Sequence, residues 1–261
     1  MTNFLPILLY HRIDASLLST STAPMVFRRH LEWLYDRGWR TLSAQEFAYH
    51  LRTGRPFPPA SFLITFDDGY TSLAHTAFDI LKELDYSAIG FLSTKMLCDE
   101  TQAIQASRSA HEERVFLSWE QVRALQASGV FDFHSHTHSH QRFEQRSLDD
   151  IRQDLGMSLD ILVRELALPR RHFTHLAWPW GKSEQEWRTV AKDCGFDYQY
   201  TVARRAFRRD FPLDQIPRTC FDAVGLTRFQ VQIELQSGHL SDMWHAAYPV
   251  GRSLRRFARL S

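Results

Sequence analysis

The order of segments along the chain constrains its fold more than any other feature of the sequence. Short apolar runs alternate with amphipathic stretches whose apolar residues recur at helical spacing. The run 61–66 has no polar alternation, which is typical of a strand buried on both faces. Strands that alternate with helices predict an α/β fold with a parallel sheet. The expected strands are 8–10, 61–66, 88–92, 130–133 and 176–178, and the expected helices are 25–37, 73–84, 118–128, 149–166 and 184–194.

Two adjacent carboxylates follow the run 61–66. Side chains alternate across a strand, so Asp67 and Asp68 point in different directions and can take different tasks. One can bind a metal ion while the other handles a proton. Gly69 lets the chain turn sharply where the carboxylates emerge. Because ligands of α/β folds bind at the carboxyl-terminal ends of the strands, we expect this pair at a functional rim.

A second motif contains four histidines within residues 134–140. His136 and His140 are four residues apart, close enough to hold one ion, and with Asp68 they make a His2Asp set. Three such ligands leave a coordination position open for water, as in catalytic zinc sites. An ion there would lower the pKa of that water, and Asp67 could accept its proton. The same ligand set suits zinc, cobalt, nickel or iron.

Each motif also has a plainer interpretation. An Asp-Asp-Gly tripeptide is more often a surface turn, and a histidine-rich tract can be a loose metal-binding or solvated loop. The position of both motifs after strand-like runs favours the catalytic interpretation. We expect His134 and His138 to stand outside the ligand set, because only one alternate set of side chains can face a single ion.

These motifs resemble those of the polysaccharide deacetylases of the NodB-homology type, also called carbohydrate esterase family four. Thr-Phe-Asp-Asp-Gly stands at 65–69 and Ser-His-Thr-x-x-His at 135–140. The resemblance implies a distorted (β/α) barrel of about seven repeats. It also implies that Asp67 is the general base. The implied ligands of a divalent metal, with zinc as the first choice, are Asp68, His136 and His140.

Within that family the chain is most similar to the poly-N-acetylglucosamine deacetylases and related exopolysaccharide enzymes. It shares their Tyr-His-Arg start at 10–12 and an Ala-aromatic-Pro-aromatic-Gly motif at 177–181. The wider family has a base-orienting arginine just ahead of the Pro-aromatic pair, where this chain has Trp178. Arg218 is the candidate substitute, and a solvated arginine at a strand end is the alternative. The family's late Leu-x-His motif has no counterpart, because His239 has a different setting, so the general acid is unassigned.

Further residues are expected to line a substrate groove. His11 follows an apolar run and would either line the site or be buried with a backbone carbonyl as its partner. Period-two alternation predicts that Trp178 and Trp180 share a side, and Trp180 is the preferred wall for a sugar ring. Backbone N–H groups near Tyr70 are the expected oxyanion donors. The predicted substrate-binding residues are Tyr70, Trp180, Arg218 and His11.

Together these assignments predict a metal-dependent hydrolase that removes N-acetyl groups from N-acetylhexosamine residues. The substrate would be a polysaccharide, an oligosaccharide or a lipid-linked sugar. Metal-bound water would be the nucleophile, and Asp67 the general base. Two alternatives stay open: a hydrolase of a small amide that is not a carbohydrate, and a catalytically silent module that binds sugar or metal.

Composition bounds the number of domains and the kind of partner. With 261 residues and 44% hydrophobic content, the chain can bury one large core. We expect a catalytic domain over 1–225 and a carboxyl-terminal extension with a basic tail over 226–261. Residues 97–113 are polar and predict an insertion near the rim. A net charge of +1 argues against a nucleic-acid partner.

The sequence also predicts a cellular location. Cys98, Cys194 and Cys220 show no paired spacing, which favours a reducing compartment over a disulfide framework. Neither a signal peptide nor a membrane-spanning segment is expected, so we predict a cytoplasmic enzyme, at the inner face of the membrane if its substrate is lipid-linked. The basic run 251–260 predicts a weak peripheral membrane contact, with a solvated tail as the alternative.

Overall fold

The computed structural model describes residues 4–97 and 115–237, together with Met243. Within these ranges, no helical segment combines the length and the apolar character needed to traverse a bilayer. Several sequence expectations fall outside the described residues: those for 98–113, the basic run 251–260, Cys98 and His239.

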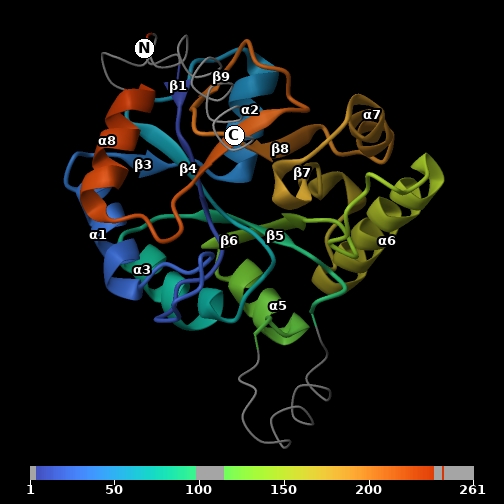
Figure 1. The fold of residues 1–261 in the computed structure, drawn as a ribbon, viewed down its shortest axis with the longest axis horizontal. Coiled ribbons are helices and arrows are strands. Elements are labelled where there is room, and N and C mark those ends of the chain that lie inside the picture. Colours follow the sequence, from blue (N-terminus) through green and yellow to red (C-terminus); the bar gives the residue numbers. More distant parts are fainter. Residues whose placement is uncertain (1–3, 98–114, 238–242, 244–261) are drawn as a thin grey trace, which may run out of the picture.

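Parallel strands close into a barrel, as the sequence predicted (Figure 1). Around the barrel the order is β2-β10-β8-β7-β6-β5-β4, and pairing between β2 and β4 completes the ring. The short β3 (Arg40–Thr41) pairs with the start of β4. The barrel strands are β2 (Ile7–Tyr10), β4 (Ser61–Phe66), β5 (Ala88–Leu92), β6 (Phe131–Ser135), β7 (His175–Ala177), β8 (Tyr198–Val202) and β10 (Ile216–Cys220).

Helices surround the barrel, with α1 and α8 on one side of Figure 1 and α6 and α7 on the other. Serine caps begin α2, α5 and α6, each with a reciprocal capping box that satisfies two backbone donors. The helices are α1 (Pro24–Tyr35), α2 (Ala44–Thr53), α3 (Phe78–Glu83), α5 (Trp119–Ala127), α6 (Leu148–Leu166), α7 (Gln185–Asp193) and α8 (Leu226–Ser237).

One end of the barrel is closed by α2 and by a small antiparallel pair, β1 (Phe4–Leu5) with β9 (Phe207–Arg208) (Figure 1). Phe47 of α2 stacks on Phe57 with ring centroids 5.7 Å apart, and both join the apolar interior of the barrel. Because β1 leads directly into the start of β2, this is the amino-terminal end of the strands. The opposite, carboxyl-terminal end is therefore the one left for chemistry.

The structure departs from the predicted elements where the apolar pattern is interrupted. The expected helix 73–84 is divided into a π-helical turn, Leu73–Ala77, and α3. Strand β6 extends to Ser135, beyond the expected end at 133. Sequence analysis missed the two-residue strands β1, β3 and β9, the helices α2 and α8, and the strands β8 and β10. Strand β8 contains polar residues, and β10 contains a proline and an arginine, where an apolar run was sought.

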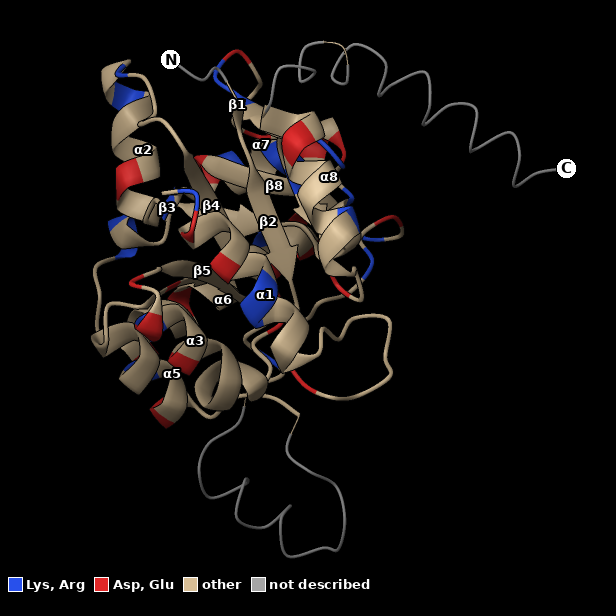
Figure 2. Ribbon diagram, turned by 90° about the vertical axis from the view of Figure 1, so that its left-hand side faces the viewer, with Lys and Arg blue, Asp and Glu red and all other residues tan. Residues whose placement is uncertain are grey.

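Helix α8 belongs to the predicted carboxyl-terminal extension and packs on the barrel domain. Phe229 of α8 stacks on His30 of α1 with ring centroids 4.1 Å apart. Phe229 and Ile233 are buried in the layer between the barrel and its helices. The domain division at residue 225 stays a prediction, as does the absence of a nucleic-acid partner. Figure 2 shows residues of both charge signs dispersed over the described part of the ribbon.

Candidate metal centre and active site

Three side chains converge at the carboxyl-terminal end of β4 and β6. Asp68 Oδ1 lies 3.4 Å from His136 Nε2 and 3.2 Å from His140 Nε2. Asp68 and His136 are buried, and His140 is half-buried. Burial alone would raise the pKa of Asp68, but its interactions with the neighbouring histidines, His136 foremost, lower it to about 2. The carboxylate is therefore ionised at neutral pH, as a metal ligand must be.

This cluster fits a divalent ion by its donor set and by an unsatisfied atom. Asp68 Oδ1 is buried and accepts no hydrogen bond, which is costly unless a cation occupies the space in front of it. His136 donates from Nδ1 to the carbonyl of Ala177 at 2.7 Å, so its Nε2 is left as the ligand atom. Two imidazoles and one carboxylate suit zinc and related ions and leave coordination positions open.

The turns after β4 and β6 aim these ligands at one point. Asp68 and Gly69 both have positive φ, 73° and 86°, which reverses the chain directly after the strand. In the histidine motif, Thr137 and His140 have φ of 68° and 50°. Thr137 Oγ1 accepts the N–H of His140 at 3.1 Å, and Ser135 Oγ accepts the N–H of Thr137 at the same distance. Local hydrogen bonds thus hold the strained loop in place.

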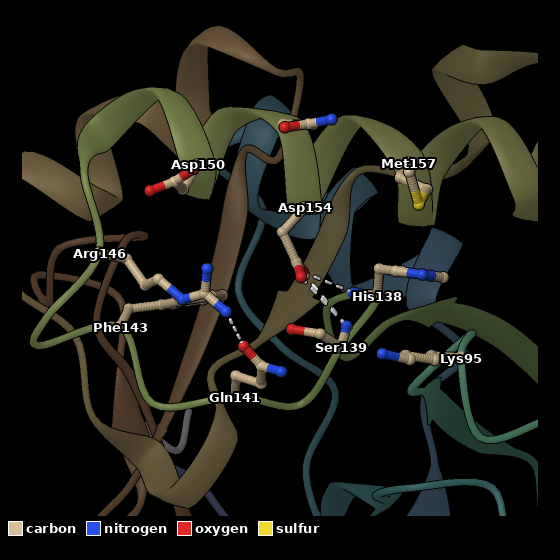
Figure 3. Close-up of a pocket in the computed structure, with 10 residues that line it drawn as sticks. Lys95, His138, Ser139, Gln141, Phe143, Arg146, Asp150, Asp154 and Met157 are labelled. Carbon is tan, nitrogen blue, oxygen red and sulfur yellow. Dashed lines mark hydrogen bonds between the residues drawn. The ribbon is translucent and has the colours of Figure 1, made fainter.

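Asp154 of α6 supports the same loop from outside, a role that sequence analysis missed. Its carboxylate accepts the N–H of His138 at 2.8 Å and that of Ser139 at 3.2 Å (Figure 3). His138 itself bonds Thr94 through Nδ1 at 2.9 Å and lines a pocket beside α6. Its ring therefore lies outside the ligand cluster. An aspartate within an amphipathic helix gives no local signal that distinguishes this role from solvent exposure.

Asp67 lies beside the cluster and is held by Arg218. The guanidinium donates from Nη1 to Asp67 Oδ1 at 2.6 Å and from Nη2 to Oδ2 at 2.8 Å. Asp67 Oδ2 is 3.8 Å from His136 Nε2, so the second carboxylate reaches the edge of the metal centre. Burial opposes ionisation of Asp67, but Arg218 and His136 outweigh it and lower its pKa below the usual range. The carboxylate can therefore accept a proton at neutral pH.

Arg218 is completely buried, which corrects its predicted place in the substrate groove. It lies on β10 behind Asp67, donates to Thr65 Oγ1 at 3.2 Å and sits 5.2 Å from the ring centroid of Phe91. Trp178, at the position where the family has its arginine, is also buried and donates its indole N–H to Gln199 at 3.0 Å. Both side chains therefore lie in the core.

Replacing Arg218 with Met should lower the free energy of unfolding by about 3–5 kcal/mol, because Asp67 would be left as an unpaired buried charge. Arg218→Lys keeps the charge but loses the two-point contact, so we expect a smaller loss. Urea denaturation of both variants measures these values. Arg123→Met is the matched control, since the half-exposed Arg123–Glu165 pair should contribute only about 0–1 kcal/mol. A loss below 1 kcal/mol for Arg218→Met would contradict the assigned contact.

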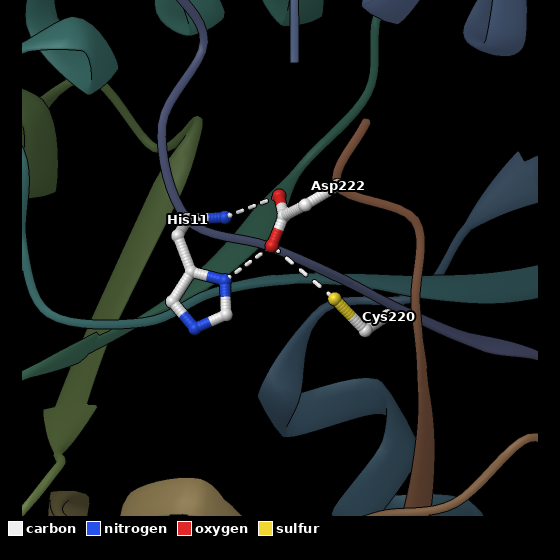
Figure 4. Close-up of side chains that lie close together, drawn as sticks. All are labelled: His11, Cys220 and Asp222. Atoms are coloured by element: carbon white, nitrogen blue, oxygen red, sulfur yellow. Dashed lines mark hydrogen bonds and ion pairs between the residues drawn. The ribbon is translucent and has the colours of Figure 1, made fainter. Parts of the chain in front are cut away.

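A second charged pair joins the start of the chain to the end of the barrel (Figure 4). Asp222 Oδ2 lies 2.5 Å from His11 Nδ1, and Asp222 Oδ1 accepts the His11 backbone N–H at 3.1 Å. Cys220 Sγ also donates to Asp222, at 3.2 Å. Burial would lower the pKa of His11, but its hydrogen bond to Asp222 raises it to about 11. The partner of His11 is thus a carboxylate and not the backbone carbonyl that the alternative interpretation expected.

Trp178 and Trp180 lie on different sides, contrary to the predicted alternation. Trp178 ends the extended segment, whereas Trp180 has a φ of 55° within a tight turn, so period-two geometry stops between them. Trp180 is 49% exposed, and its ring centroid is 4.6 Å from that of His140. A half-exposed aromatic side chain therefore borders the metal cluster, and the guanidinium of Arg142 lies over its ring, 5.4 Å from the centroid.

Tyr70 lies on the other side of the same rim. Its ring stacks on Phe116 with centroids 4.9 Å apart. The bridge between these residues uses the N–H groups of Thr71 and Leu117, which bond Val115 and Gly69. Among the described residues, that bridge does not use the N–H of Tyr70.

Comparisons with known proteins found matches in both sequence and fold. The sequence model of the family described as polysaccharide deacetylase matches residues 54–199, more than half of the chain. A poly-beta-1,6-N-acetyl-D-glucosamine N-deacetylase of Staphylococcus epidermidis is 27% identical over 206 residues, covering 76% of this chain and 67% of that protein.

Solved structures show the same fold. The Streptococcus pyogenes deacetylase PplD, in complex with acetate, superposes with a TM-score of 0.74 at 21% identity, over 89% of this chain and 98% of that one. IcaB from Ammonifex degensii superposes with a TM-score of 0.71 at 24% identity, over 90% and 97% of the two chains. At these identities the likeness concerns the barrel itself.

Proposed function

The chain belongs to the polysaccharide deacetylase family, and from that premise we propose that it is a metal-dependent N-deacetylase of N-acetylhexosamine residues in a glycan or a lipid-linked sugar. The observation that carries the proposal is the position of Asp67, a buried and ionised carboxylate held by Arg218 at the edge of the His2Asp cluster. Metal binding by itself needs only that cluster. A second oriented carboxylate supports hydrolysis over a silent binding module.

When bound, the ion would supply Lewis-acid polarisation of the acetyl carbonyl and of the attacking water. The residues that would hold it are Asp68, His136 and His140. Asp67 accepts the proton as water adds to the carbonyl carbon, and the two bonds from Arg218 keep its carboxylate in one orientation. The N–H of Tyr70 is the candidate donor to the oxygen that gains negative charge.

We assign the missing general acid to His11. Asp222 holds its Nδ1 and stabilises the imidazolium, so Nε2 is the atom that can deliver a proton. The positive charge of His11 also contributes to lowering the pKa of Asp67 and of Asp68, which is consistent with a role in the same site. As the carbon–nitrogen bond breaks, the nitrogen takes this proton, and the products are acetate and the free amine. His11 thus acts in proton transfer as well as lining the site.

Replacing Asp222 with Asn should shift the alkaline limb of the kcat profile to lower pH. His11 must be protonated to act as an acid, and in the native protein its raised pKa of about 11 keeps it so through neutrality. Without the carboxylate, its pKa should fall to or below the ordinary value of about 6.5, so activity would disappear as the pH rises through that range. The variant should recover activity toward acidic pH. Measured pH profiles of kcat check this expectation.

The matched control for Asp222→Asn is Asp210→Asn, which removes an exposed carboxylate paired with Arg208. Its profile should coincide with that of the native protein. An unchanged alkaline limb in Asp222→Asn would remove His11 from the role of acid.

The half-exposed side chain of Trp180 beside His140 supports a carbohydrate substrate, since sugar rings pack against exposed aromatic surface. The test is acetate release from N-acetylglucosamine oligomers, from a lipid-linked N-acetylhexosamine and from small acetylated amines. Metal-stripped protein is assayed alone and with zinc or cobalt added back, and Asp67→Asn serves as the blank. We expect metal-dependent acetate from a sugar substrate. Release only from the small amines would favour the alternative hydrolase, and no release with metal bound would overturn the proposed function.

A further inference from the structure

We propose that Asp132, His134 and His172 form a second binding site for a divalent transition-metal ion, separate from the catalytic cluster. One ligand atom from each residue lies within 4.8 Å of those of the other two. Asp132 Oδ1 is 2.8 Å from His172 Nε2, and Asp132 Oδ2 is 3.5 Å from His134 Nε2. Two imidazoles and one carboxylate therefore surround one point, which is the donor set that zinc, cobalt and nickel accept.

The topology separates this cluster from the active site although both use β6. Asp132 and His134 project from the strand on one face at period-two spacing, whereas His136 follows its carboxyl-terminal end. His172 ends the turn Arg170–His172 that precedes β7. The pocket lined by this cluster also contains Ala44, Ala48 and Arg52 of α2, the helix that closes the amino-terminal end of the barrel. The second site thus faces away from the catalytic rim.

His134 supplies an independent indication of a ligand. Its side chain is only 2% exposed, and neither Nδ1 nor Nε2 has a hydrogen-bond partner. A buried imidazole without partners carries an uncompensated desolvation cost. His175, whose ring centroid is 4.6 Å away, directs its own Nδ1 to Tyr200 at 2.8 Å and does not relieve this cost. An ion held between Asp132 and Nε2 of His134 would relieve the cost at that nitrogen.

Two features predict how this site differs from the catalytic one. Arg52 and Arg171 line the same pocket, and their charges oppose a cation, so the affinity should be weaker than at the catalytic cluster. The rings of His134 and His172 are nearly parallel, with 10° between their planes. Because an ion lies near the plane of each ring that binds it, we expect the more exposed His172 to turn on binding.

The experiment is the zinc content of the full chain after equilibrium dialysis. We expect two ions per chain for the native protein, one for His140→Ala, in which the catalytic site is lost, and none for His140→Ala combined with His172→Gln. The exposed His75→Gln is the matched control and should leave two. Cobalt spectra of His140→Ala should show a bound ion that disappears when His172→Gln is added.

Asp132→Asn provides a second route to the same loss, so the result does not depend on one variant, and circular dichroism verifies that each protein is folded. No ion bound to folded His140→Ala, or an unchanged content after either His172→Gln or Asp132→Asn, would overturn the proposal. Failure here is distinct from failure of the proposed function. Whether or not the second site binds an ion, His172→Gln with zinc at the catalytic site should release acetate at the native rate.

Discussion

The Asp67→Asn protein should retain its catalytic metal and lose about 10²–10⁴-fold in kcat, the usual contribution of a positioned proton acceptor. Asparagine has nearly the same shape as aspartate and can still accept one hydrogen bond from Arg218, but its amide cannot take a proton at neutral pH. The ligand atoms of the metal cluster belong to other residues, so metal content should be unchanged. Acetate release and elemental analysis of the same sample measure both quantities.

Asp79→Asn is a suitable control, because Asp79 is an exposed carboxylate on α3. It should alter neither kcat nor metal content. If Asp67→Asn turned over at the native rate with metal bound, the base would have to be another group. If it lost its metal, Asp67 would have to be reassigned as a ligand.

The His136→Ala protein should lose both its catalytic metal and its activity. His136 is buried, its Nε2 faces Asp68, and its Nδ1 is committed to Ala177; among the described residues, the cluster has no third imidazole to substitute for it. Loss of an outer partner of a ligand typically costs about 10–100-fold in metal affinity, and loss of the ligand itself should cost more. Titration with zinc in the presence of a competing chelator measures the affinity of this site.

His138→Ala is the matched control for this prediction, since His138 lies two residues away in the same motif and bonds Thr94 outside the cluster. Its metal affinity should stay near the native value. Equal losses in the two variants would mean that the motif acts only as a loop and that His136 is not a specific ligand.

Much of the fold could be predicted from the sequence, because buried parallel strands leave continuous apolar runs. The segments Ser61–Phe66 and Ala88–Leu92 were predicted with the bounds that the structure shows. Strand β10 was missed, since Pro217 and Arg218 interrupt its apolar character. Strand β10 lies between β2 and β8 and pairs with both, and its arginine is compensated by the ion pair with Asp67. The hydrophobic pattern of the sequence does not predict a partner that lies on a distant strand.

The candidate ligands and base could be named from local motifs because each motif combines a strand end with a tight turn. Carboxylates that follow a strand directly must emerge at its rim, so Asp67 and Asp68 were identifiable before any contact was known. By contrast, the exposed Trp180 and the buried Trp178 were assigned to one side, because the sequence does not show that a turn with positive φ begins between them.

The sequence by itself predicted parallel strands that alternate with helices, from periodicity, and the four candidate residues around the metal, from spacing within a few residues; the closed barrel was implied by the family resemblance. Only the tertiary structure decided which side chains pair with the residues of the active site. Arg218 reaches Asp67 across 151 residues of chain, and Asp222 reaches His11 across 211. Both contacts arise because closure of the barrel places β10 beside β2, and β2 beside β4, and hydrogen bonding between strands so distant in sequence leaves no local trace.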